Sequence, residues 1–549
     1  MNYQKGLIHV AIIRIIIILL FFPVVNATAQ TTITKPASTK YKRSGAYQKL
    51  WGHHYRKEWE TPVSFKIAQL DTLAGGLVPY EAGGGRQSTS LRLRDANGRE
   101  YVLRSIDKSF GKALPEIVQG TFIESLANDQ VTIAHPYSAI TIGPMAEAAG
   151  IYHTNPLFYF IPTQKSLGQF NDYAGDKLYL FEQRPDENWE TAPNFGNSKN
   201  ITGTDKMLEK IHGDNDNVVD QQAYVRARLF DMFIGDWGRH EDQWRWATFK
   251  ADSVTTYVPV PRDRDQAYTI FDGKLVGFLK SMAGAKHMQS FSDDIKDFTN
   301  YNFPARYLDR HLTNSVTLSD WLNISKDLQG RLTDAVIESA VKQLPPEVYK
   351  ISGPGITAKL KSRRSHLQKY ADIYYHFLAR EVDITGSEKS DLFEINRINN
   401  DSTEVRIYKL SDIGQVKDKL FYHRVFYNYE TKEIRLYGLK GQDQFRVTGN
   451  VSKGIDVRLI GGPEKDQFTE TSAVGKSGHQ TKIYDNKENE FSTTRETALK
   501  LSTAPSVHAF NYDAFEYDKK GLRPLAMYNR EDKIYVGLAY KYTRQKWRK

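Results

Sequence analysis

The chain has 549 residues, 40% of them hydrophobic and 12% aromatic, which excludes an intrinsically disordered protein and predicts about two to four domains. It contains no cysteine, which excludes disulfides, thiolate metal sites and cysteine nucleophiles. The net charge is +10, but 75 basic residues are interspersed with 65 acidic ones, which favours an ordinary solvated surface over a polyanion-binding one. No nucleic-acid-binding motif is present, and we expect no nucleic-acid partner.

The N-terminal segment has the features of a signal peptide. Lys5 and Arg14 precede an apolar run at 15–25, and small residues follow at 27–29. Such a run is too short to span a membrane, and no cysteine follows it to carry a lipid anchor. We therefore predict that residues 1–29 are a signal peptide and that the protein is exported to the periplasm or the outer membrane.

An ordered α+β unit is predicted from residue 50 to residue 385, after a polar linker at 30–49. Alternation of apolar and polar residues predicts strands, and the turn at 95–98 predicts a hairpin. Segments with one apolar face predict helices, one of which carries Glu124 off its apolar stripe. The expected strands are 63–70, 89–93, 100–105, 157–162 and 177–182, and the expected helices are 115–133, 221–233, 318–344 and 358–379.

Three consecutive glycines, Gly83, Gly84 and Gly85, stand just before the predicted hairpin. Three glycines in a row do not contribute to packing. They either form a mobile turn or allow backbone amides to approach a ligand such as phosphate.

The segment 221–268 brings two charged loops together, because a predicted hairpin returns the chain to its starting point. The first loop carries Asp236, Arg239, His240, Glu241 and Asp242, and the second carries Arg262, Asp263, Arg264 and Asp265. Converging carboxylates suit a divalent cation and phosphate chemistry. The alternative is a loop held by salt bridges, since acidic and basic residues alternate in the second loop.

A small all-β domain is predicted at 390–503. Its segments 441–445 and 463–468 resemble each other at a spacing of 23 residues between Asp443 and Asp466, which predicts two turns of a β-solenoid. Structural turns are favoured there over a calcium site.

The final segment, 504–549, contains strict alternation of apolar and small or polar residues at 534–543. This pattern is typical of a membrane β-strand. The strand is either an edge of the preceding domain or a stub of a barrel.

The sequence at 234–240 resembles the catalytic loop of atypical kinases, which include phosphoinositide lipid kinases and HipA-type and CotH-type kinases. The resemblance implies an atypical-kinase-like α+β domain that uses ATP with Mg²⁺ or Mn²⁺. It implies that Asp263 binds the metal, where we expect Asp265 and Asp236 to help, and that Gly83, Gly84 and Gly85 cover the phosphates. Arg104 or Lys108 takes the place of the phosphate-binding lysine, and Glu124 the place of its helix partner.

Four stretches, at 83–95, 103–108, 235–246 and 261–268, also resemble the central region of large envelope proteins of Bacteroidetes-type bacteria. In those proteins a phosphoesterase-like domain, this region and a BamA-like outer-membrane barrel occur in one chain. The resemblance implies an outer-membrane barrel or another envelope component as partner.

Several positions depart from the kinase pattern. The catalytic aspartate would fall on Gly238, and the second metal-binding amide on Gln243. Asp236 is then the candidate base, with Asp242 as a further metal ligand. Arg239 is expected to tie the loop down, and His240 to hold the loop or to shuttle a proton. Two hypotheses follow: a secreted kinase-like domain that binds nucleotide or phosphate with a divalent cation, and a non-catalytic scaffold or gate of a barrel protein.

Overall fold

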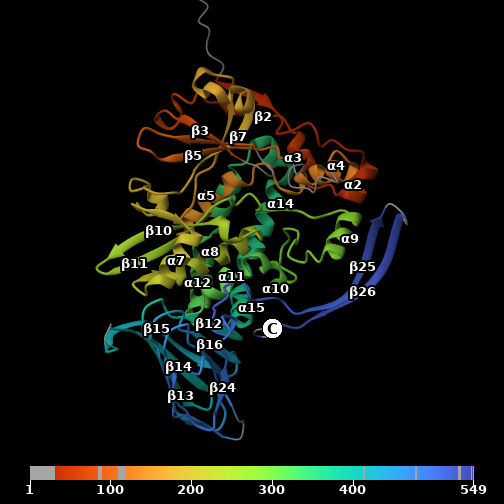
Figure 1. The fold of residues 1–549 in the computed structure, drawn as a ribbon. Helices are drawn as coiled ribbons and strands as arrows, with labels where there is room; N and C mark the ends of the chain where they lie inside the picture. Colours follow the sequence, from red (N-terminus) through yellow and green to blue (C-terminus); the bar gives the residue numbers. More distant parts are fainter. Residues whose placement is uncertain are drawn as a thin grey trace, which may run out of the picture.

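The computed structural model describes residues 31–83, 89–108, 119–411, 414–475, 479–529, 533–545 and 547. The predicted signal peptide, Gly84, Gly85 and the first part of the predicted helix at 115–133 lie outside these residues. The fold is a mixed α+β fold: a β-sheet stands at the top of Figure 1, a helical body lies in the middle, and a second β-rich unit lies below it.

The first sheet has seven strands in the order β1-β2-β6-β7-β5-β4-β3. Its central strands are amphipathic, and Leu91, Leu93 and Leu103 are fully buried on one face. The hairpin predicted at 95–98 is confirmed: β4 and β5 pair antiparallel, and Asp95 Oδ1 accepts from the Asn97 N–H at 2.9 Å. The strands are β1 (Thr32–Lys35), β2 (Val63–Ile67), β3 (Val78–Gly83), β4 (Ser90–Arg94), β5 (Glu100–Ser105), β6 (Leu157–Ile161) and β7 (Lys177–Gln183).

The segment expected to be a linker at 30–49 is structured where it is described. Strand β1 pairs with β2, and helix α2 (Gly45–Trp51) is capped by Ser44, whose side chain accepts from the Tyr47 N–H. The polar composition of this segment does not predict a strand, because β1 is a short edge strand with no buried residue.

The helical body is built around α8 (Gln221–Ile234), which is buried along most of its length. The side chain of Asp220 accepts from the Ala223 N–H at its start, and Gly235 in a left-handed conformation (φ 81°) ends it. Helices α12 and α15 pack against it.

Two long helices expected from the sequence are each divided in two. The expected helix at 318–344 is broken at Thr333, whose side chain caps the following helix by accepting from the Val336 N–H. The expected helix at 358–379 begins earlier and is broken at His366. These four helices are α12 (Leu318–Arg331), α13 (Asp334–Val341), α14 (Pro346–Ser365) and α15 (Leu367–Ala379).

Shorter helices complete this part of the chain. They are α3 (Arg56–Glu60), α4 (Phe122–Asp129), α5 (Ala139–Ala148), α6 (Asn171–Ala174), α7 (Thr204–Gly213), α9 (Lys274–Ala283), α10 (Phe298–Tyr301) and α11 (Arg306–His311). Within the described ranges, no helix is both long and apolar enough to cross a membrane.

A second sheet, in the order β8-β10-β11-β9, contains the predicted hairpin between the two charged loops. Trp244 at the start of β10 pairs with Pro261 at the end of β11, and the Arg262 N–H donates to Gln243 O at 3.1 Å. The hairpin therefore sets the loop at 235–243 beside the loop at 262–268, as predicted. The strands are β8 (Ile201–Gly203), β9 (Asn217–Val219), β10 (Trp244–Ala251) and β11 (Val254–Pro261).

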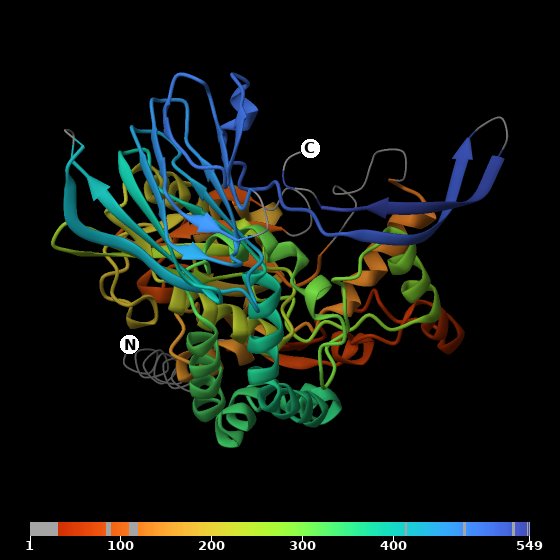
Figure 2. The same cartoon turned by 90° about the horizontal axis from the view of Figure 1, so that it is seen from below.

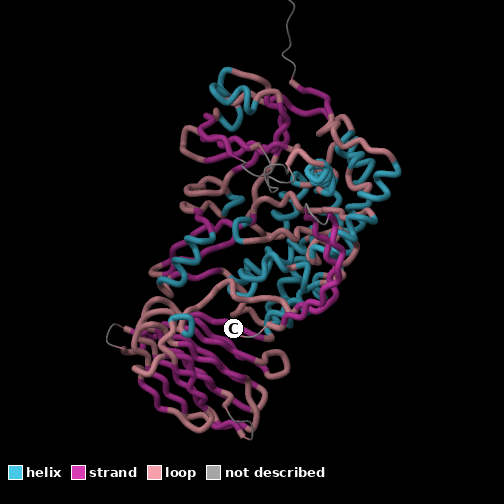
Figure 3. Tube along the Cα trace, turned by 45° about the vertical axis from the view of Figure 1, so that its right-hand side comes forward, coloured by secondary structure: helices cyan, strands magenta, loops and turns pink. Residues whose placement is uncertain are grey.

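The lower unit is a β-solenoid with mostly parallel strands, which lie side by side in Figure 3. One sheet has the order β12-β16-β19-β22-β24 and the other β15-β14-β13-β17-β20-β23, with a two-stranded ladder of β18 and β21. Its strands are β12 (Glu381–Thr385), β13 (Asp391–Asn399), β14 (Ser402–Leu410), β15 (Val416–Tyr427), β16 (Glu433–Tyr437), β17 (Gln444–Thr448), β18 (Asn450–Val451), β19 (Asp456–Ile460), β20 (Gln467–Glu470), β21 (Ala473–Val474), β22 (Thr481–Asp485), β23 (Glu490–Ser492) and β24 (Thr497–Leu501).

The two resembling segments are successive coils of a longer ladder. Phe393, Phe445, Phe468 and Phe491 stack in register, with neighbouring ring centroids 4.5, 4.9 and 5.4 Å apart. An acidic or amide residue precedes each phenylalanine by two positions, and in the last three coils its side chain accepts from the backbone of the coil before it. These bonds join Asp391 N–H to Asp443, Asp443 N–H to Asp466 and Asp466 N–H to Asn489, at 2.7, 2.8 and 2.9 Å.

The alternating segment at the C-terminal end forms a separate hairpin, not an edge of the solenoid. Strands β25 (Lys519–Asn529) and β26 (Lys533–Thr543) pair with each other as a two-stranded sheet. Figure 2 shows this hairpin extending away from the body of the molecule.

Candidate functional site

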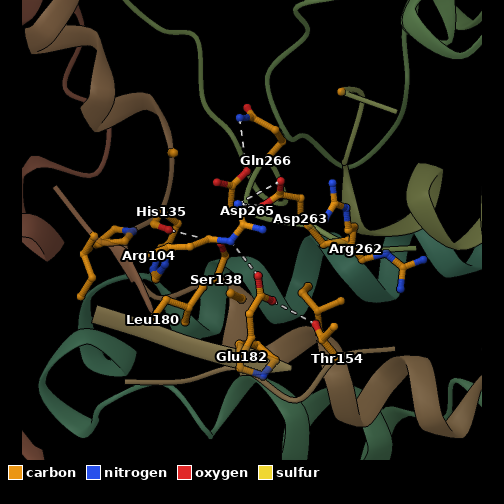
Figure 4. A pocket seen from close by; sticks show the side chains of 18 of the residues that line it. Arg104, His135, Ser138, Thr154, Leu180, Glu182, Arg262, Asp263, Asp265 and Gln266 are labelled. Carbon is orange, nitrogen blue, oxygen red and sulfur yellow. Dashed lines mark hydrogen bonds and ion pairs between the residues drawn. The ribbon is translucent and has the colours of Figure 1, made fainter. Parts of the chain in front are cut away.

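A cavity of about 380 Å³ lies where the first sheet faces the two loops of the central hairpin. Strands β5 and β7 supply one wall with Arg104 and Glu182, and the loop after β11 supplies another with Asp263 and Asp265. Apolar side chains, including Ile142, complete the lining. Figure 4 shows the charged side chains turned toward one another.

Arg104 joins the two walls. Its Nε donates to Glu182 Oε1 at 2.8 Å, and its Nη1 lies 3.1 Å from Asp263 Oδ1. Burial opposes the charge on Arg104, but Asp263 and Glu182 outweigh it, and the pKa of Arg104 is raised. Arg104 therefore stays a cation inside a partly enclosed cavity. Burial raises the pKa of Glu182, a change that Arg104 opposes.

Lys108 makes a second ion pair, with Asp265. Burial disfavours the charge on Lys108, but the Asp265 carboxylate overcomes this and raises its pKa. Burial also acts against the charge on Asp263, but Arg104 and other nearby cations hold its pKa below the usual value. The cavity therefore contains two pairs of a cation with a carboxylate, Arg104 with Asp263 and Lys108 with Asp265.

Asp263 has a left-handed backbone, with φ of 60°. This conformation is uncommon outside glycine, although aspartate tolerates it better than most residues. The loop turns sharply between Arg262 and Arg264. Asp263 lines the cavity, and Arg264, which also borders the cavity, donates to Asp231 of the helical body.

Asp231 of α8 fixes both loops from beneath. Its Oδ1 accepts from Arg264 Nη2 at 3.0 Å, and its Oδ2 lies 3.3 Å from Arg239 Nε. Arg228 also contacts Asp231, at 3.1 Å. Sequence reasoning missed Asp231, although the signal was available as a lone acidic residue within the apolar run of this helix.

Arg239 holds its loop in place, as predicted. Its guanidinium is fully buried and donates to the backbone carbonyl groups of Arg262 (2.7 Å) and Gln243 (2.8 Å). It lies beneath the cavity, so it positions the loops and does not line the site.

Asp236, the candidate base, is also placed beneath the cavity. It is 1% exposed, its Oδ1 accepts from the Gly238 N–H at 3.1 Å, and its Oδ2 lies 3.5 Å from Arg239. Burial raises the pKa of Asp236 to about 7, and Arg239 opposes this shift. The Asp236 carboxylate shapes the loop from below, and it is absent from the described lining of the cavity.

The cavity wall at the loop 235–243 is formed by Trp237, Gly238, His240 and Gln243. His240 is exposed, and its Nε2 lies 3.4 Å from Gln243 Nε2. Asp242, expected as a metal ligand, is exposed and does not line the cavity as described; its backbone carbonyl accepts from Arg262 Nε at 3.1 Å.

Two further candidates lie apart from the cavity. Glu124 accepts from the Gly120 N–H at 2.5 Å, and the described acidic partners of Arg104 and Lys108 are Glu182, Asp263 and Asp265 instead. Gly83 ends β3, and its carbonyl accepts from the Tyr173 hydroxyl at 2.7 Å. The predicted phosphate contacts of Gly84 and Gly85 lie outside the described residues.

In the described part of the chain, no group of three or more acidic or histidine side chains is placed to hold a metal ion. The cavity nevertheless suits a metal that arrives with phosphate. Mg²⁺ is commonly held by one or two carboxylates together with substrate phosphates and water. Asp263 and Asp265 would supply those carboxylates, and Arg104 and Lys108 would face the phosphates.

No protein-family model matches the chain, and no curated protein matches it either. Among solved structures, the Helicobacter pylori proinflammatory kinase CtkA aligns with 55% of this chain and 95% of its own, at 11% identity and a TM-score of 0.25. The Rio2 kinase of Chaetomium thermophilum, in a complex with ADP, Mg²⁺ and phosphoaspartate, aligns with 48% of this chain and 72% of its own, at 13% identity and a TM-score of 0.20.

Proposed function

We propose that this cavity binds a nucleoside triphosphate together with a divalent cation. The observation that carries the proposal is the pairing of two cations with two carboxylates inside the cavity, Arg104 with Asp263 and Lys108 with Asp265. Each pair joins a cation to a carboxylate, so a ligand that carries both signs of charge can replace both partners.

The charge balance explains why nucleotide and metal would bind together. Phosphate alone would compensate Arg104 and Lys108 but would leave Asp263 and Asp265 without partners. A cation alone would do the reverse. Leaving a buried charge unpaired is costly, so each component of the pair favours the entry of the other.

The residues of the cavity support nucleotide binding better than they support phosphoryl transfer. Gly238 has no side chain where the resembling kinases carry their catalytic aspartate, and the nearby Asp236 is buried under the loop. Positioning and charge neutralisation supply much of the catalysis of phosphoryl transfer, but the acceptor still needs to be oriented. We therefore favour a kinase-like nucleotide-binding domain of low or no transferase activity.

Isothermal titration of the mature chain tests cooperative binding. ATP in the presence of Mg²⁺ is expected to bind at least about tenfold more tightly than ATP with chelator, because the charge compensation is then complete. Mn²⁺ is expected to replace Mg²⁺. Equal affinity with and without the cation would contradict the proposed charge exchange.

We further propose that the protein acts in the bacterial envelope, in the periplasm or at the outer membrane, beside a barrel or another envelope component. The apolar segment at 15–25 with its flanking basic residues supports export. Fractionation of cells that express the full chain tests this proposal: recovery of the uncleaved chain in the cytoplasm would contradict it.

A further inference from the structure

A second cavity, of about 830 Å³, lies between the base of the β25–β26 hairpin and the helical body. The ends of α9, α10 and α15 and the segment 515–518 form its other walls. Its volume is within the usual range of small-molecule sites. Neither the sequence motifs nor the proposed nucleotide site accounts for it.

Basic residues dominate the lining. Seven basic side chains border the cavity against three acidic ones, and the basic set includes Arg380, Lys520, Lys541 and Arg544. These four are exposed, and none forms an ion pair with another described residue. Of the acidic residues, Glu381 is already paired with Arg435 at 2.7 Å. The cavity therefore has an excess of uncompensated positive charge.

Arg310 lies at the inner wall of the cavity and is 9% exposed. Its guanidinium stacks on Phe515 at 4.0 Å, and its Nη2 donates to Glu381 O at 2.5 Å and lies 3.8 Å from Asp383 Oδ2. Its Nε is buried without a hydrogen-bond partner among the described residues. A buried donor of this kind is costly unless a partner is supplied, and an anionic oxygen is the partner that guanidinium binds best.

Aromatic side chains give the cavity an ordered floor. Phe377 stacks on Tyr517 with centroids 5.5 Å apart, and Phe303 lies 5.1 Å from Tyr517. The Tyr517 hydroxyl donates to Thr299 O at 3.1 Å, which fixes the segment that carries it. The cations therefore surround a packed wall and do not simply extend into solvent.

We propose that this cavity is a second anion-binding site, which takes a ligand bearing several phosphate or sulfate groups. Clustered anionic groups would satisfy Lys520, Lys541 and Arg544 at the hairpin base, with Arg310 at the inner wall. Such a ligand is either a soluble polyphosphorylated molecule or the headgroup of an anionic lipid, since both present the same chemistry. The proposal does not depend on nucleotide binding at the first cavity.

The test is isothermal titration of the full mature chain with myo-inositol hexakisphosphate. The test variant carries Lys520→Glu and Lys541→Glu at the hairpin base. The control carries Lys487→Glu and Lys500→Glu, which change the net charge equally at exposed lysines on the solenoid, outside this cavity. A third variant, Arg104→Ala, reports binding of the probe at the first cavity.

Saturable binding is expected, weakened at least about tenfold in the test variant and less than about twofold in the control and in Arg104→Ala. No saturable binding to the wild-type chain, or equal losses in the test and control variants, would overturn the proposal. Melting curves confirm that each variant is folded. Co-sedimentation with phosphatidylglycerol vesicles then separates the two sources: vesicle binding that the probe displaces identifies a lipid headgroup, and probe binding without vesicle binding identifies a soluble ligand.

Discussion

Arg104 on β5 and Asp263 in the loop after β11 face each other across the candidate cavity, with Nη1 and Oδ1 3.1 Å apart. The two residues are 159 positions apart in the chain, so the fold creates this pair. It links the sheet to the central hairpin and places opposite charges where a phosphate and a metal ion are proposed to bind.

Arg104→Lys is expected to weaken the binding of ATP with Mg²⁺ by about tenfold, because a lysine is a point charge and does not span two groups as the guanidinium fork does. In the structure this fork contacts Glu182 and Asp263 together. Titration calorimetry measures the change. Arg94→Lys, which affects an exposed pair with Glu100 on the same sheet, is the control. An unchanged affinity in Arg104→Lys would remove Arg104 from the site.

Asp231→Asn is expected to destabilise the helical body by about 3 kcal/mol or more, because it leaves buried arginines without their shared carboxylate. Arg239 and Arg264 both depend on Asp231. Urea unfolding followed by tryptophan fluorescence measures the loss. The surface variant Asp327→Asn, whose partners Arg226 and Arg331 are partly exposed, is expected to cost less than about 1 kcal/mol. Similar losses in both variants would contradict the structural role of Asp231.

Gly238→Asp tests whether the missing carboxylate limits catalysis. A Cβ at this position would lie 3.3 Å from Gln266 Cγ, the nearest neighbour, which belongs to a flexible side chain, and the glycine is not in a left-handed conformation. We expect ATP hydrolysis or autophosphorylation to rise at least about a hundredfold, the lower range for a positioned base. Gly330→Asp, on an open surface of α12, is the control. No gain in a folded, nucleotide-binding variant would show that the base position is not what limits activity.

Much of the fold could be predicted from local patterns. The hairpin at 95–98, strands β2, β4, β5, β6 and β7 of the first sheet and helix α8 follow from local signals, namely alternation, turn residues and apolar stripes, whereas β1 and β3 were not predicted. The adjacency of the two charged loops was also predictable, because a short hairpin connects them. The division of the long helices at Thr333 and His366 was less visible, since their apolar stripes continue through the breaks.

The site was only partly predictable, because its partners come from distant segments. The sequence around Glu182 predicts an ordinary buried strand. Its role as the partner of Arg104 depends on the pairing of β5 with β7 in the sheet. Asp236 looked like a base because of its place in the motif. The structure buries it through contacts with Gly238 and Arg239 that the spacing of the motif does not reveal.

The solenoid is expected to lose stability as pH rises. Burial raises the pKa of Asp466 to about 8 and that of Asp485 to about 7, from ordinary values of 3.8. The Oδ2 atoms of both residues lie against the same side of Gly461, so the two carboxyl groups are close neighbours. The folded state therefore holds a proton more tightly than the unfolded state. The contribution of the protonated Asp466 and Asp485 to the free energy of unfolding is fully present below about pH 4 and is lost as pH rises through 7 to 8.

Hydrogen exchange in β20 and β22 measures this effect locally. Exchange corrected for its intrinsic pH dependence is expected to be at least about tenfold faster at pH 8.5 than at pH 5.5 in the wild-type chain. In Asp466→Asn the side-chain oxygen can still accept from the Asp443 N–H, but the side chain does not ionise. The corrected exchange of this variant should therefore change much less between pH 5.5 and pH 8.5. The same pH dependence in the variant would assign the effect to other groups.

The central claim is that Asp263 and its neighbours hold a nucleotide with a metal ion, and the thermal shift of the mature chain tests it most directly. With excess ATP and Mg²⁺ the melting temperature of the wild-type chain should rise by several degrees, because ligand at about a hundred times its Kd adds about 2.7 kcal/mol. Asp263→Asn should abolish the shift, whereas Asp242→Asn, at an exposed residue outside the cavity lining, should retain it. Identical melting curves of the wild-type chain with and without ATP and Mg²⁺ would contradict the account.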